Sequence, residues 1–159
     1  MPTSLRQTSP RTTKSTIETV MAAIPAHVIE RYSRDKALGM DHASADHVEL
    51  AKFLILSMGG SRKCVPSKYV DDVWHNFILH TREYRAFCES VLGYFVDHSP
   101  AKPGDDVLET MATYNETRAR LEILHGSLNE KVWPKLDERL ETMKNGCRND
   151  CRNCMSECH

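Results

Sequence analysis

The sequence predicts an all-α protein, an irregular helical bundle with a disordered N-terminus and a Cys-rich C-terminal tail. Apolar residues recur at intervals of three and four positions through most of the chain, the period of an amphipathic helix. The chain shows no strand ladder. Its 159 residues are 40% hydrophobic and 27% charged, as in an ordinary soluble globular protein. We therefore expect one helical domain over residues 16–145, between a disordered tail (1–15) and a Cys-rich tail (146–159).

Charge and hydropathy argue against several classes of protein. The net charge of −1 produces no global attraction to nucleic acid or to an anionic membrane. No apolar run approaches the roughly 18 residues of a membrane span. The basic N-terminus, MPTSLRQTSPRTTKST, lacks the apolar core of a secretory signal. We expect a cytoplasmic protein with no dedicated nucleic-acid surface; a protein partner and the oligomeric state stay open.

The first three helices are delimited by proline, glycine and a capping residue. One helix is expected over residues 16–24, and a second over 26–38. Ser44 is a plausible N-cap for a third helix, which ends at Gly59. This third helix is apolar nearly all round, so it is expected at the centre of the bundle. Its buried stripe is Leu50, Phe53, Leu54 and Met58.

The later helices follow the same logic. A fourth helix starts near Pro66, and an apolar pattern resumes after Thr81 and runs to Gly93. A long helix over residues 105–125 ends at Gly126. Ser127 with Glu130 is a capping-box signature for a last helix, which would continue to about residue 145. The expected core faces are Val70, Val73, Trp74, Phe77 and Ile78 on the fourth helix, and Val107, Met111, Tyr114 and Leu121 on the long one.

The fourth helix carries an unusual polar motif, VDDVWHNFILHT. Asp71 lies one turn before His75, and such an acid can hold one ring nitrogen and leave the other free for a metal or a proton. His80 lies roughly 140° around the helix from His75, so the two histidines do not naturally share one metal. The simpler interpretation is a histidine that hydrogen-bonds a buried corner.

A longer pattern around this motif resembles a known family. The stretch VPSKYVDDVWHNFILHTREYRAFCESVLGYFVDHSP resembles the core motif of the glycine-rich domain-containing protein-like family, which occurs as small bacterial proteins of unassigned function and within larger plant proteins linked to stress responses. Asp97 precedes His98 where the family often has two adjacent histidines. The resemblance implies a helical fold and a shared polar centre. The matching positions are Pro66, Asp71, Trp74, His75, Thr81, Tyr84, Cys88, Gly93, Phe95 and His98.

We infer from these residues that Asp71, His75, Cys88 and His98 converge. Antiparallel packing of the next helix would bring Cys88 towards His75, and His98 could fold back after the break at Gly93. Such a set has suitable donors for zinc or iron. The alternative is a buried hydrogen-bond cluster that pins the two helices together.

The C-terminus, CRNDCRNCMSECH, is a second candidate metal site. Its four cysteines are soft donors for zinc, copper(I) or an iron–sulfur centre. One helix cannot wrap them around a single ion, because their span is roughly 16 Å in a helix, whereas a loop could, with His159 as an alternative ligand. A disordered tail, adventitious disulfides and a thiol redox role are the competing interpretations. The predicted ligands are Cys147, Cys151, Cys154 and Cys158.

The leading functional interpretation is a small metal-binding protein with an internal His/Asp/Cys site and a C-terminal thiolate site. A regulatory or protein-interaction module with a purely structural Trp–His core is one alternative. A metal-dependent oxidoreductase or hydrolase is another, in which His75 is a ligand or general base and Asp71 orients it. A further group, Asp41, His42, Asp46 and His47, is interpreted as solvated residues at a helix N-terminus.

Overall fold

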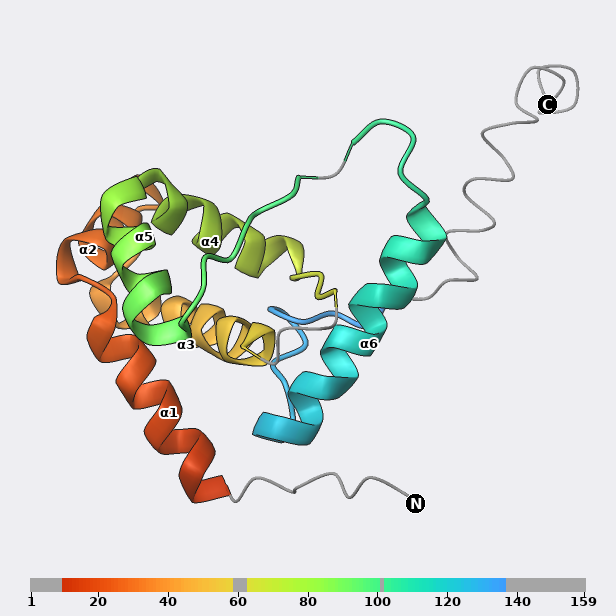
Figure 1. The fold of residues 1–159 in the computed structure, drawn as a ribbon, viewed down its shortest axis with the longest axis horizontal. Helices are drawn as coiled ribbons and strands as arrows, with labels where there is room; N and C mark the ends of the chain where they lie inside the picture. Colours follow the sequence, from red (N-terminus) through yellow and green to blue (C-terminus); the bar gives the residue numbers. More distant parts are fainter. Residues whose placement is uncertain (1–9, 59–62, 101, 137–159) are drawn as a thin grey trace, which may run out of the picture.

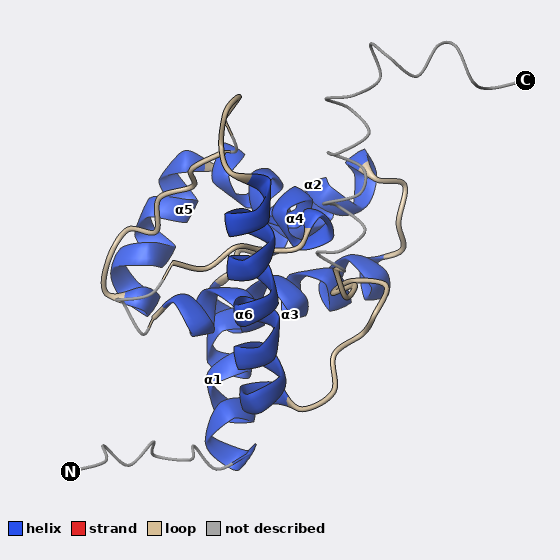
Figure 2. Cartoon of the chain, turned by 90° about the vertical axis from the view of Figure 1, so that its right-hand side faces the viewer, coloured by secondary structure: helices blue, strands red, loops and turns tan. Residues whose placement is uncertain are grey.

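The computed structural model describes residues 10–58, 63–100 and 102–136, and these residues form helices joined by loops (Figures 1 and 2). No strand occurs in these three ranges, so the predicted all-α class is confirmed for them. None of the helices there is long and apolar enough to span a bilayer. The elements are α1 (Pro10–Ala23), α2 (Ala26–Asp35), α3 (Met40–Ser57), α4 (Lys68–Leu79), α5 (Thr81–Phe87), the π-helix η1 (Cys88–Leu92) and α6 (Val107–His125).

Helix α3 lies at the centre, as its sequence predicts. It contacts α1, α2, α4 and α6 (Figure 1), and apolar side chains on most of its circumference make this possible. Leu50, Phe53 and Leu54 are buried as expected. Met58 is 40% exposed because it follows the last helical residue instead of lying within the buried stripe.

Helix α3 starts earlier than predicted. Gly39, not Ser44, is the N-cap, and its carbonyl accepts a hydrogen bond from the backbone N–H of Ala43, which is fully buried. The longer helix places Asp46 and His47 inside the bundle, so their interpretation as solvated residues is wrong. Asp46 accepts hydrogen bonds from the hydroxyls of Tyr32, at 3.2 Å, and Tyr69, at 2.8 Å, which satisfy its buried carboxylate.

The N-terminal helix also starts earlier than expected. Helix α1 begins at Pro10, within the segment predicted to be a disordered tail, and proline is tolerated in a first helical turn because its missing N–H has no helical partner there. The rest of that predicted tail, residues 1–9, lies outside the described residues.

The segment after α6 is not the predicted helix. Residues 127–136 form turns and irregular backbone. Glu130, expected to complete a capping box, instead accepts a 2.6 Å hydrogen bond from the Arg118 guanidinium. Trp133 is fully buried and its indole N–H donates to Glu49 at 2.8 Å, while Pro134 supplies no backbone N–H for a helix. Tertiary contacts outweigh the local capping signal here; the predicted continuation beyond residue 136 lies outside the described residues.

Candidate metal centre

Helix α4 is the platform of the candidate centre. Its N-cap is Ser67, whose hydroxyl accepts a hydrogen bond from the backbone N–H of Val70 at 3.1 Å. The predicted apolar face is buried, apart from a half-buried Ile78. Asp71 and His75 lie one turn apart at the margin of this face, with side chains 33% and 49% exposed. The helix thus presents a carboxylate and an imidazole beside each other, where solvent and ions have access.

The segment after η1 returns across α4 and carries His98 to this margin (Figure 1). The reversal occurs at Gly93, whose φ of 80° lies in the left-handed region that favours glycine. The returning segment is anchored by Tyr84, whose hydroxyl donates to the carbonyl of Val96 at 2.8 Å and accepts from the indole N–H of Trp74 at 3.0 Å. His98 therefore lies two residues after Val96, whose carbonyl is held by this hydrogen bond.

The anchoring phenol is buried. Tyr84 is 2% exposed, and burial raises its pKa well above its ordinary value of 10, with a smaller contribution from neighbouring Cys88. Because the phenol stays protonated, it remains a donor to Val96 across the pH range in which the protein would operate.

Two imidazoles meet the Asp71 carboxylate. His98 Nε2 lies 2.8 Å from Asp71 Oδ1, and His75 Nδ1 lies 3.4 Å from Asp71 Oδ2. The ring centroids of His75 and His98 are 4.3 Å apart, and the edge of Trp74 packs against His98 at 4.9 Å. The His98 side chain is only 14% exposed, because it packs against Trp74 and contacts the Asp71 carboxylate. The predicted convergence of these three residues is therefore present in the structure.

The hydrogen bonds define which ring nitrogens are free. His75 Nδ1 lies 2.7 Å from the backbone carbonyl of Asp71, closer than the carboxylate. A carbonyl only accepts, so Nδ1 carries the proton and Nε2 keeps a lone pair. The backbone carbonyl thus sets the tautomer, a role that sequence reasoning assigned to the carboxylate. If His98 Nε2 donates to Asp71, its Nδ1 likewise keeps a lone pair.

The three residues have the spacing of a metal-ligand set. One potential ligand atom of Asp71, one of His75 and one of His98 lie within 4.8 Å of one another. Around a tetrahedral ion bound at about 2.0–2.1 Å, neighbouring ligand atoms are about 3.3 Å apart. The 2.8 and 3.4 Å distances from Asp71 involve the ring nitrogens that face it as hydrogen-bond donors, so an ion would bind after displacing these protons or through the opposite ring nitrogens. Two histidines and one carboxylate with open positions suit zinc or iron(II).

The other predicted ligands are not brought to this group. Cys88 is fully buried beside the Tyr84 side chain, and it is not among the residues whose ligand atoms converge with Asp71. The terminal cysteines, Cys147, Cys151, Cys154 and Cys158, lie outside the described residues.

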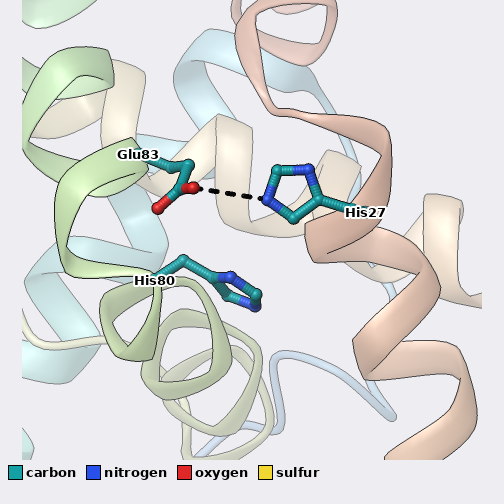
Figure 3. A group of neighbouring side chains, drawn as sticks. All are labelled: His27, His80 and Glu83. Carbon is teal, nitrogen blue, oxygen red and sulfur yellow. Dashed lines mark ion pairs between the residues drawn. The ribbon is translucent and has the colours of Figure 1, made fainter.

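Sequence reasoning missed a second group of potential ligands, formed by His27, His80 and Glu83 (Figure 3). The spacing of three residues between His80 and Glu83 was a visible signal. His27 precedes them by more than fifty residues, and only the packing of α2 beside α4 brings it to them.

Comparison with known proteins finds one family. The family described as UCP032817-like matches residues 22–145, more than half of the chain, and its description names no activity. No curated protein and no solved structure matches the chain.

Proposed function

The chain belongs to the UCP032817-like family, and we propose that it is a small metal-binding protein with its internal site at Asp71, His75 and His98. The observation that carries the proposal is the contact of His98 with Asp71 at 2.8 Å, across 27 residues of sequence, beside an imidazole at the adjacent turn of α4. Zinc or iron(II) is the ion that this donor set favours.

Accessibility favours a metal site over a hydrogen-bond cluster that only pins helices. A cluster with a purely architectural role is usually buried, where its bonds are strongest. Here His75 is about half exposed and Asp71 one third exposed, so an ion can enter and displace a proton from an imidazole. Metal binding at this site should therefore weaken as pH falls, because protons compete for the same ring nitrogens.

The C-terminal tail is proposed as a separate thiolate site for zinc or copper(I), on the basis of its four cysteines alone. The likeness to the glycine-rich domain-containing protein-like family is retained as part of the proposal, because the motif residues Asp71, Trp74, His75 and His98 are those that the candidate centre uses.

The alternative of an interaction module with a structural Trp–His core is favoured by one observation. The Trp74–Tyr84–Val96 hydrogen bonds and the packing of Trp74 on His98 would hold the segment together without any ion. An enzyme would need a cavity beside the metal. One cavity, of about 310 Å³, lies at the first turn of α4, and Asp72 rather than Asp71 lines it. This cavity is therefore not beside the candidate centre and gives no support to an enzyme.

The test is the metal content of the full chain, purified without an affinity tag under anaerobic conditions. A chain lacking residues 146–159 should retain at least one equivalent of metal. In that background Asp71→Asn or His98→Gln should lower affinity at least tenfold, about 1.4 kcal/mol. Asp72→Asn is the matched control, because Asp72 is adjacent, exposed and paired with Lys36 instead.

Two results would contradict the proposal. Retention of full affinity in both Asp71→Asn and His98→Gln would remove the site from these residues. Loss of all metal with the tail would leave the internal group as a structural hydrogen-bond cluster.

A further inference from the structure

The second group of ligands joins α2 to the α4–α5 junction, on another side of α4. His27 lies in the first turn of α2, His80 at the junction of α4 and α5, and Glu83 in the first turn of α5. Their side chains converge on the space between α2 and this junction (Figure 3). Each residue offers one ligand atom, and these atoms lie within 4.8 Å of one another. Like the first centre, this group consists of two histidines and one carboxylate.

This group is left unsatisfied by the protein itself. The Nε2 atom of His80 is inaccessible to solvent and has no hydrogen-bond partner among the described residues. The distance from His27 Nε2 to Glu83 Oε1 is 3.6 Å, too long for a good hydrogen bond. The His27 and His80 rings meet edge to face with centroids 5.4 Å apart. A buried nitrogen without a partner destabilises the fold.

The backbone holds these ligands in place before any ion binds. The backbone N–H of His80 donates to the Phe77 carbonyl at 3.0 Å, and the His80 carbonyl accepts from the backbone N–H of Tyr84 at 2.8 Å. Helix α2 is tied to α4 by Asn76, whose amide donates to the Val28 carbonyl at 3.2 Å, one residue after His27. The helix starts that carry the ligands are thus fixed relative to each other.

We propose that His27, His80 and Glu83 form a second site for a divalent ion of the zinc class, which clips the start of α2 to the α4–α5 junction. The 3.6 Å separation of His27 and Glu83 is close to the about 3.3 Å expected between ligands of a tetrahedral ion. Two imidazoles and a carboxylate leave a fourth position for water, as in zinc sites with three protein ligands.

The two centres are separate sites. His75 and His80 are five residues apart and so lie roughly 140° apart around the helix, and each has its own carboxylate. The second site is therefore independent of the proposed function, and either can fail without the other.

The test uses zinc as the probe and the full chain with its four tail cysteines replaced by serine, so that thiolates do not contribute. Zinc titration should reveal an equivalent that His27→Gln and Glu83→Gln remove or weaken at least tenfold and that Asp71→Asn leaves intact. His27 is 55% exposed, so its replacement should not disturb folding. His42→Gln, an exposed histidine in neither group, is the matched control.

Hydrogen exchange supplies a second readout. Saturating zinc should slow exchange of the amides in the first two turns of α2 in the parent chain and in His42→Gln, and a chelator should reverse the effect. In His27→Gln the slowing should be lost. Equal zinc stoichiometry and affinity in the parent, His27→Gln and Glu83→Gln chains, or unchanged exchange in α2 on zinc addition, would overturn the proposal.

Discussion

Replacing Tyr84 with phenylalanine should release the segment that carries His98 while the bundle still folds. The change removes only the hydroxyl that accepts from Trp74 at 3.0 Å and donates to Val96 at 2.8 Å. The ring remains, and with it the edge-to-face contacts to Phe77 and Phe95. Any effect therefore reports on the two hydrogen bonds and not on a cavity.

The expected cost follows from burial. The indole N–H of Trp74, a residue 5% exposed, loses its acceptor, and a buried donor without a partner costs about 1–3 kcal/mol. Val96 is half-buried, so its carbonyl can bind water instead, and the loss of this hydrogen bond costs about 0.5–1 kcal/mol. We expect Tyr84→Phe to lower the free energy of unfolding by about 1.5–4 kcal/mol. It should also weaken zinc binding at the Asp71 centre, because His98 follows the released segment.

Urea denaturation followed by circular dichroism measures the first effect, and zinc competition titration of the tail-deleted chain measures the second. Tyr114→Phe is the matched control, because the Tyr114 hydroxyl is part of one bond, to the Pro134 carbonyl at 2.8 Å, in a different part of the bundle. It should cost about 1 kcal/mol and leave zinc affinity unchanged. A Tyr84→Phe chain with the stability and zinc affinity of the parent would refute the reasoning.

Three further predictions concern the bundle. Burial lowers the pKa of His47 and of His125 below the ordinary 6.5, so just below pH 6.5 the unfolded chain binds more protons than the folded chain. The free energy of unfolding should therefore be highest above about pH 6.5 and fall as the pH drops through this value. A urea midpoint that does not change with pH would contradict this. Ser67→Ala should destabilise the protein by about 1 kcal/mol in thermal unfolding, because α4 loses its N-cap, and an unchanged melting temperature would count against the cap. Gly126→Ala should lower the free energy of unfolding by about 1–3 kcal/mol, because a φ of 81° with a ψ of −156° is adopted essentially by glycine alone. Gly39→Ala is the control and should lower it less, because Gly39 has a φ of −68°. Equal decreases in the two variants would be the contrary result.

Sequence periodicity was sufficient to predict most of the helices and most of their buried faces, although Val107, expected on the buried face of α6, is 47% exposed. The apolar positions of α4 and the central place of α3 follow from the spacing of their side chains, because burial of one face is a local property of a helix. The helix ends at Gly93 and Gly126 could also be predicted, because glycine readily adopts the positive φ that both residues have. The pairing of Asp71 with His75 follows from the helical repeat alone.

Where local signals compete with distant partners, sequence reasoning failed. The capping box at Ser127 and Glu130 predicted a helix, yet Glu130 pairs with Arg118 and residues 127–136 form no helix. His47 appeared solvated and is fully buried. In both cases the deciding contacts come from other helices, and no spacing along the chain encodes them.

By itself, the sequence determined an all-α chain, the side of α4 that faces the core, and the carboxylate–imidazole pair on its margin. Only the tertiary structure decided which ligands join them. The reversal at Gly93 and the Tyr84 anchor bring His98 to Asp71, Cys88 points instead into the core beside Tyr84, and the packing of α2 on α4 brings His27 to His80. A helix repeat specifies neighbours within about two turns. Contacts between segments depend on how the chain reverses and on which buried groups hold it there.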